Sequence, residues 1–99
     1  MWEPKQIKHP SILMSLEYEE FASIEVEKRI KGAIAQFVIS INIFDIIEDS
    51  VVTFDLREVE KALSCIKKQI EELYDKIPLF DDDDLDEWIE SFQENLSSY

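Results

Sequence analysis

The sequence predicts an α+β domain, an antiparallel sheet of three to four strands at about residues 11–55 with two C-terminal amphipathic helices packed on one face. The helices are expected at about residues 55–77 and 82–96. Apolar side chains recur at every second position in the first half of the chain, which is the period of a strand, and at every third or fourth position in the second half, which is the period of a helix. Strands that precede helices in this way are typical of α+β domains.

One domain with one core is expected to span residues 11–99, because a chain of 99 residues with 45% apolar side chains can bury enough of them. Residues 1–10 are expected to form an N-terminal arm. Pro4 and Pro10 favour extended backbone at the residues before them. We expect Trp2 to dock on the domain.

The first strands are expected on either side of a hairpin bend at Gly32. Between Ser11 and Phe21, apolar residues alternate as in a strand, and a two-residue pattern continues to Ile30. Gly32 is the strongest turn signal in the chain and predicts a hairpin bend. A polar turn is expected at residues 48–50, followed by a short strand at 51–54 that leads into the first helix.

The most apolar run, residues 33–47, is predicted to form a central strand. It is rich in β-branched residues, which restrict the side-chain torsion and favour a pleated backbone. The same run also fits a helical face, because five of its apolar residues follow a helical spacing: Ile34, Phe37, Val38, Ile41 and Phe44. An all-α bundle is therefore the alternative fold.

The first helix carries an apolar face of seven residues, spaced alternately three and four positions apart: Leu56, Val59, Leu63, Ile66, Ile70, Leu73 and Ile77. Asp55 is expected to cap its first turn while Glu58 reaches back, and Phe54 is expected to pack on Val59. Pro78 has no N–H group and disfavours helix at the preceding residue, so the helix should end there.

The second helix follows the four aspartates at 81–84. Its apolar residues also share one face: Leu85, Trp88, Ile89, Phe92 and Leu96. Carboxylates at a helix N-terminus cap free N–H groups and meet the positive end of the helix dipole. Helix stability therefore accounts for some of these aspartates.

Negative charge is concentrated in the last third of the chain. The whole chain has a formal net charge of −13, and beyond Lys68 it contains eleven acidic residues but a single basic one, Lys76. Glu71, Glu72 and Asp75 fall in the last turns of the first helix, where the dipole disfavours anions. Local stability does not explain these three, which suggests a role in binding.

The candidate partner-binding residues are the carboxylates that crowd this region: Glu71, Glu72, Asp75, Asp82, Asp83, Asp86, Glu87, Glu90 and Glu94. Four of them, at positions 83, 87, 90 and 94, form a row on the outer face of the second helix, with neighbours about 5–6 Å apart. The alternative is a solvated face that only keeps the protein soluble. Trp88, Phe92, Tyr74 and Tyr99 lie near this region as possible anchors, although Trp88 and Phe92 also fit the core.

The sequence gives no support to a catalytic, cofactor or metal site. His9 is the single histidine, and Cys65 is the single cysteine, with no histidine or cation cluster beside it in sequence. One glycine cannot build a phosphate-binding loop. The aspartate run is not an EF-hand, because Asp86 and Phe92 stand where that loop needs glycine and glutamate. We therefore expect no enzyme, no cofactor and no metal.

Size, charge and element order together resemble the small acidic immunity proteins and antitoxins that neutralise nuclease toxins. This resemblance implies a non-catalytic inhibitor that blocks a basic nucleic-acid-processing enzyme. A phage or mobile-element nucleic-acid mimic, acting on a host restriction, CRISPR or repair enzyme, is the first alternative. An assembly subunit that forms a homodimer through the 56–77 helix is the second.

The strongly negative chain should be repelled by nucleic acid and by anionic membranes, so the expected partner is a basic protein. The sequence has neither a signal-peptide pattern nor a long apolar run. We therefore expect a cytoplasmic protein without membrane contact.

Overall fold

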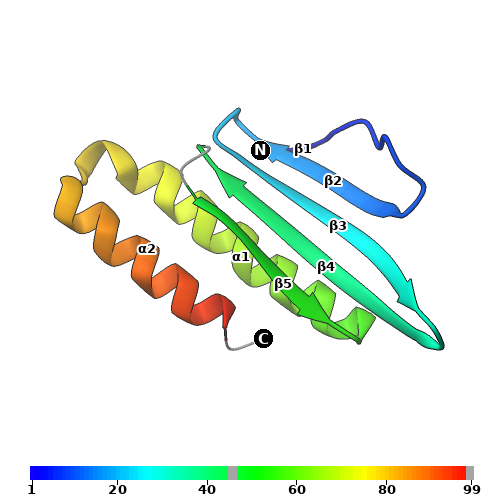
Figure 1. Cartoon of the computed structure of the whole chain (residues 1–99). Coiled ribbons are helices and arrows are strands. Elements are labelled where there is room, and N and C mark those ends of the chain that lie inside the picture. The colour runs from blue at the N-terminus through cyan, green and yellow to red at the C-terminus, as the bar shows by residue number, and fades with distance from the viewer. Residues whose placement is uncertain (45–46, 98–99) are drawn as a thin grey trace.

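The computed structural model describes residues 1–44 and 47–97 and has two layers, a five-stranded antiparallel sheet and a pair of helices (Figure 1). The strands follow one another in the order β1-β2-β3-β4-β5: β1 Trp2–Pro4, β2 Ile12–Tyr18, β3 Ala22–Lys31, β4 Ile34–Ile43 and β5 Ile47–Thr53. The helices are α1 Leu56–Lys76, the short 3-10 helix η1 Ile77–Leu79, and α2 Asp82–Leu96. The predicted α+β fold is confirmed.

The sheet has five strands where the sequence predicted three to four. The additional strand is β1, in which Trp2 lies opposite Tyr18 and Pro4 opposite Leu16. Residues 48–50, expected as a turn, belong to β5 instead. β5 is an edge strand, and Glu48 and Ser50 alternate with buried Ile47 and Val51, so its polar residues are consistent with a strand that has one face in solvent.

Within the run at 33–47, Ile34–Ile43 form strand β4 as predicted, and the helical alternative for this run is wrong. The strand ends earlier than expected, because Phe44 has a φ of 55° and Ile47 already belongs to β5. Residues 45 and 46 lie outside the described residues. The hairpin at Gly32 is present, with φ at +63°. A second hairpin between β2 and β3 was not predicted: Glu19 and Glu20 both have positive φ, and the N–H of Phe21 donates to the carbonyl of Tyr18 at 2.7 Å.

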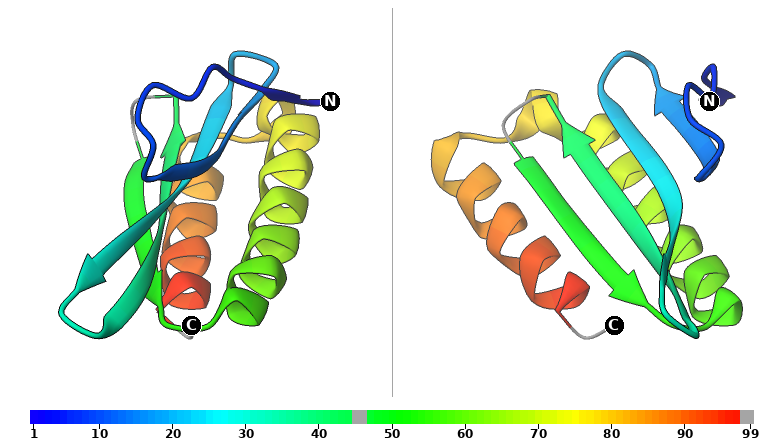
Figure 2. Two further views of the ribbon diagram at one scale, coloured as in Figure 1. Left: turned by 90° about the vertical axis from the view of Figure 1, so that its right-hand side faces the viewer. Right: turned by 45° about the vertical axis from the view of Figure 1, so that its right-hand side comes forward.

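Both helices cover the same face of the sheet, and the opposite face carries no helix (Figure 2). On β3, Ala22, Ile24 and Val26 are buried toward the helices, whereas Ser23 and Glu25 alternate with them and face away. β4 repeats this alternation in register, with Ile24 opposite Ile41. The two-residue period of the sequence therefore decides which face of the sheet forms the core.

The core lies between this apolar sheet face and the helices. α1 contributes Val59, Ala62, Leu63, Ile66, Ile70 and Leu73, and α2 contributes Phe92 and Leu96. Full burial of a Val, Leu, Ile or Phe side chain stabilises the fold by about 1.5–3 kcal/mol relative to leaving that side chain exposed. The predicted apolar face of the first helix is thus buried inside the domain from Val59 to Leu73. Its first member, Leu56, is exposed, and its last, Ile77, is partly buried and belongs to η1.

Asp55 caps α1 as predicted, because its Oδ1 accepts a hydrogen bond from the N–H of Arg57 at 2.9 Å. The reciprocal bond expected from Glu58 is not formed. Glu58 instead lies 3.9 Å from Lys61, and the N–H of Asp55 points to Thr53 Oγ1 at 3.4 Å. Phe54 is 64% exposed, so packing on Val59 shields little of its ring.

The reciprocal cap lies at α2 instead. Oδ1 of Asp81 accepts from the N–H of Asp84 at 2.8 Å, and Oδ2 of Asp84 accepts from the N–H of Asp81 at 3.4 Å. Two of the four consecutive aspartates therefore stabilise the start of this helix.

Candidate functional site

The candidate site is the end of the molecule where α1 finishes and α2 begins. The two helices run in opposite directions and are joined through η1, so the last turns of α1 and the first turns of α2 meet there (Figure 1). Six of the nine predicted binding residues are exposed in this region, which we call the acidic end: Glu72, Asp75, Asp82, Asp83, Asp86 and Glu87.

Two further predicted residues, Glu90 and Glu94, are exposed on later turns of α2. With Asp83 and Glu87 they form the predicted row, on the side of the helix opposite buried Phe92. The row extends from the acidic end along most of the length of α2.

Glu71 is separate from the others. Its Oε1 accepts a hydrogen bond of 2.9 Å from the indole Nε1 of Trp2, which lies on β1 at the far edge of the sheet. α2 packs along β5, at the opposite edge. The structure therefore does not bring Glu71 to the carboxylates of α2.

Among the residues that the structure describes, no carboxylate of the acidic end forms an ion pair. Four ion pairs are found among residues 1–44 and 47–97, and their carboxylates are those of Glu17, Glu19, Glu27 and Glu58. None of these belongs to the acidic end. Carboxylates held close together at a protein surface produce a negative potential that attracts cationic groups.

The predicted aromatic anchors have different environments. Phe92 is buried in the core, and Trp88 is half-buried, stacked on Phe92 with ring centroids 4.9 Å apart and planes 13° apart. Tyr74 packs edge-on against Tyr18 at 5.3 Å, near β1. Tyr99 lies outside the described residues. Of the four predicted anchors, Trp88 is therefore the one that adjoins the carboxylates of α2.

Burial raises the pKa of the Tyr18 phenol, and the nearby carboxylates of Asp75 and Glu71 raise it further. The phenol lies between Trp2, at 5.1 Å between ring centroids, and Tyr74.

A groove of about 550 Å³ lies beside Trp88, between η1 and α2. It is lined by Lys76, Leu79, Phe80, Asp84, Glu87, Trp88 and Ser91. Leu79 is 82% exposed, the second most exposed large apolar side chain after Met1 among the described residues. Sequence reasoning gave Leu79 and Phe80 no role, although an apolar pair directly before an aspartate run was a signal for this feature.

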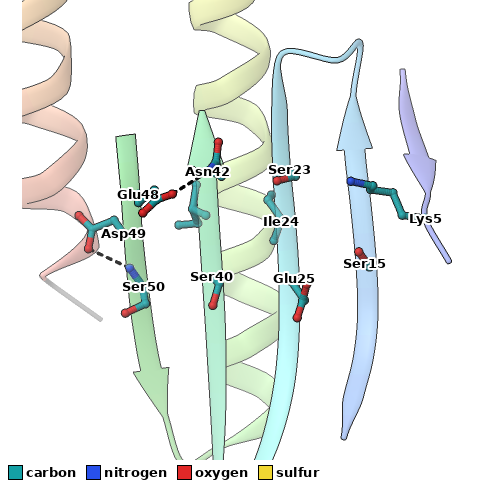
Figure 3. Close-up of a pocket in the computed structure, with 11 residues that line it drawn as sticks. Lys5, Ser15, Ser23, Ile24, Glu25, Ser40, Asn42, Glu48, Asp49 and Ser50 are labelled. Carbon is teal, nitrogen blue, oxygen red and sulfur yellow. Dashed lines mark hydrogen bonds between the residues drawn. The ribbon is translucent and has the colours of Figure 1, made fainter. Parts of the chain in front are cut away.

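The uncovered face of the sheet has a second depression, of about 520 Å³ (Figure 3). Ser15, Glu25, Ser40 and Ser50 lie opposite one another on four successive strands and cross this depression as a row of mostly small polar side chains. Beside them, Nδ2 of Asn42 donates to Oε1 of Glu48 at 3.3 Å. The residues that line this depression are mostly polar, and none of them is aromatic.

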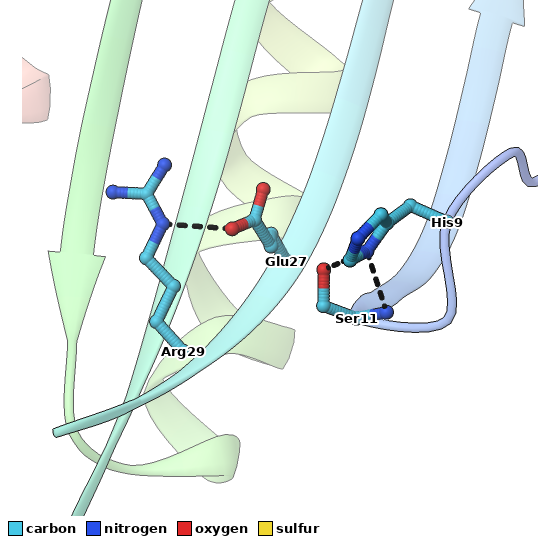
Figure 4. Close-up of polar contacts among 4 residues, drawn as sticks. All are labelled: His9, Ser11, Glu27 and Arg29. Carbon is cyan, nitrogen blue, oxygen red and sulfur yellow. Dashed lines mark hydrogen bonds and ion pairs between the residues drawn. The ribbon is translucent and has the colours of Figure 1, made fainter.

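His9 is held by its own loop (Figure 4). Its Nδ1 accepts from the N–H of Ser11 at 3.1 Å, so the Ser11 hydroxyl, 2.6 Å from the same nitrogen, is the donor of their second contact. Nearby, Nε of Arg29 donates to Oε1 of Glu27 at 2.7 Å. In the described part of the chain, His, Cys, Asp and Glu side chains nowhere gather in threes in a way that could hold a metal ion.

None of the described helices is both long enough and apolar enough to cross a membrane. The chain matches no protein-family model, no curated protein and no solved structure.

Proposed function

We propose that this protein is a non-catalytic acidic inhibitor that binds and blocks a basic nucleic-acid-processing enzyme, most simply as an immunity protein or antitoxin that neutralises a nuclease toxin. The observation that carries the proposal is the acidic end, six exposed carboxylates on two helices that take part in none of the ion pairs of the described residues. A nuclease groove that binds phosphates offers the complementary charge.

The energetics of binding favour this use of the surface. Opposite charges on two proteins accelerate their association and select against partners of the wrong sign. Glu72 and Asp75 lie near the C-terminus of α1, where the helix dipole opposes negative charge. Binding of a basic surface would offset that local cost.

A nucleic-acid mimic is the second candidate, and the row on α2 favours it. From Asp83 to Glu94 the helix rises about 17 Å. Over that length a single nucleic-acid strand carries about five phosphates, and the row carries four carboxylates. A mimic would compete with nucleic acid for the same groove on a host enzyme.

The assembly alternative has less support. A homodimer through α1 would use the apolar face of that helix, but Val59, Ile66 and Ile70 are already buried against the sheet. Light scattering at micromolar concentration tests this directly. A stable dimer that persists after charge removal at the acidic end would favour assembly.

The experiment that tests the inhibitor proposal is capture of a partner from the native host, followed by assay of that partner. The binding variant removes four charges from α1 and α2: Glu72→Gln, Asp83→Asn, Glu87→Gln and Glu90→Gln. The control removes four charges elsewhere: Glu3→Gln, Glu20→Gln, Glu25→Gln and Glu60→Gln. Both variants have the same net charge, so they separate a local surface from overall charge.

We expect the wild-type chain and the control to capture a basic protein and to inhibit its binding or cleavage of nucleic acid, and the binding variant to lose both effects. Affinity should fall steeply as salt rises, because the interaction is between exposed charges. Equal capture by both variants, or an affinity that does not change with salt, would contradict the proposed surface.

A further inference from the structure

We propose that the groove between η1 and α2 receives an arginine side chain of the basic partner. The inference rests on the proposed function and deepens it, because it names the anchor within a broad charged surface. The groove is lined by apolar side chains, an aromatic ring and two carboxylates, and each of these matches one part of arginine.

Leu79 and Trp88 provide the apolar contact. Leu79 is 82% exposed on η1 and faces the groove that half-buried Trp88 lines from α2. Phe92 stacks on one face of the Trp88 ring and holds it in place. Long basic side chains bury their methylene stems on such surfaces while the charged head stays in water.

Asp84 and Glu87 provide the negative charge. Both carboxylates line the groove. The Glu87 side chain makes no hydrogen bond or ion pair with another described residue. The Asp84 side chain makes one hydrogen bond, in which Oδ2 accepts from the Asp81 N–H at 3.4 Å. Each therefore has an oxygen available to a guanidinium.

Arginine fits better than lysine because its guanidinium is planar. It stacks on an aromatic ring and presents several N–H groups toward carboxylates, whereas an ammonium is a strongly hydrated point charge. Aromatic and arginine side chains also dominate the binding energy of protein interfaces.

Lys76 is the one cation that lines the groove. It makes no ion pair with another described residue, so its flexible side chain can move aside when a guanidinium enters. Its charge opposes any basic ligand, which makes Lys76→Gln a variant expected to strengthen binding.

Two peptides of equal charge test the proposal, one with a single central arginine between six lysines and the other with seven lysines. Calorimetry with the full-length chain measures the affinity of each at low salt. A second readout uses the Trp2→Phe variant, in which Trp88 is the only tryptophan, and follows its fluorescence. We expect the arginine peptide to bind about three- to tenfold more tightly and to be the peptide that changes Trp88 emission more.

Leu79→Ser and Glu87→Gln should each remove most of this preference. The matched controls are Ile30→Ser, an exposed apolar residue on β3, and Glu60→Gln, an exposed carboxylate on α1, and both should retain it. All four sites are exposed, so the fold should tolerate these changes, and circular dichroism verifies this.

Equal binding of the two peptides, or a preference that survives Leu79→Ser, would overturn the arginine groove. It would leave the inhibitor proposal intact, because that proposal needs only a local negative surface. The inhibitor proposal fails independently, when the partner is captured equally by the binding variant and its charge-matched control.

Discussion

The indole Nε1 of Trp2 donates a hydrogen bond to Oε1 of Glu71 at 2.9 Å and so connects the outermost strand of the sheet to α1. β1 has only three residues, too few to remain paired by its backbone alone. The Trp2 ring also lies 5.1 Å from that of Tyr18, and Tyr18 contacts Tyr74 of α1. This aromatic cluster, with one partly buried hydrogen bond to a carboxylate, attaches the arm to the domain.

We predict that Trp2→Phe lowers the free energy of unfolding by about 1–3 kcal/mol, because a hydrogen bond to a charged group is lost. Glu71→Gln should cost less, since its side-chain oxygen still accepts the bond. Urea unfolding measures both changes, with Glu60→Gln as the control for loss of charge on α1. A Trp2→Phe chain as stable as wild type would show that the contact contributes nothing.

The raised pKa of Tyr18 predicts a loss of stability in alkaline solution. At pH values below about 10 the phenol is neutral in both folded and unfolded chains, so its contribution is fully present. As the pH rises further, the unfolded chain ionises first and the folded state loses stability. Urea unfolding at about pH 8 and about pH 11 should show a smaller loss for Tyr18→Phe than for wild type.

Tyr74→Phe is the comparison for this prediction. It removes a phenol next to Tyr18 that itself raises the Tyr18 pKa, so it should reduce the alkaline loss less than Tyr18→Phe does. An equal alkaline loss in wild type and Tyr18→Phe would mean that other groups cause it. Absorbance of the phenolate, recorded in the same titration, reports the ionisation itself.

The turn between β2 and β3 stores backbone strain, which predicts a stabilising substitution. Glu19 and Glu20 have φ of 50° and 58°, a region that costs a residue with a side chain about 1–2 kcal/mol. Glu20→Gly should therefore raise the free energy of unfolding by about 1 kcal/mol, less the entropy that glycine adds to the unfolded chain. Thermal unfolding is the measurement.

The control is Glu25→Gly in β3, where the backbone is extended and glycine brings its entropic cost of about 0.5–1 kcal/mol. The two changes remove the same side chain and are expected to have opposite signs. Destabilisation in both would show that the turn is not strained.

Periodicity was sufficient to predict much of this fold. The apolar face of the first helix and the alternation in β3 and β4 each have a repeat that fits one type of element, and Gly32 indicates its own hairpin. The choice between strand and helix for residues 33–47 was harder, because both periods fit. The sheet decides it, since Ile41 pairs opposite Ile24 on β3 and Asp49 on β5.

The features that sequence reasoning missed depend on tertiary contacts. A Glu-Glu pair is not a turn signal, and the turn at Glu19 and Glu20 follows from the pairing of β2 with β3. β1 is held in place because Trp2 packs against Tyr18 and donates a hydrogen bond to Glu71, and both residues are distant from it in sequence. Short strands held by such contacts have no local pattern that predicts them.

In the candidate site, too, some features follow from helix periodicity and others depend on tertiary contacts. The period of the second helix places Asp83, Glu87 and Glu90 on one outer face, and the exposed row agrees with that. Neither the separation of Glu71 toward β1 nor the groove beside Leu79 follows from helix periodicity. Both depend on how α1, η1 and the sheet edges are placed in space.

The end of α1 predicts a conflict between stability and binding. Asp75 lies in its last turn, at the negative end of the helix dipole, which disfavours a carboxylate. Asp75→Asn should therefore stabilise the free protein by about 0.3–1 kcal/mol. Glu72→Gln, one turn earlier, should give a smaller gain. Glu58→Gln, in the first turn of the same helix, is the control and should destabilise, because there the dipole favours the carboxylate.

Urea unfolding at low and high salt measures these signs, and salt should reduce all three effects because the groups are exposed. If Asp75 and Glu72 contact a basic partner, Asp75→Asn and Glu72→Gln should also lower the affinity of the protein for that partner. Glu58→Gln should change this affinity little. A stabilised chain with undiminished affinity would mean that these carboxylates lie outside the contact, and the binding surface would then be confined to α2.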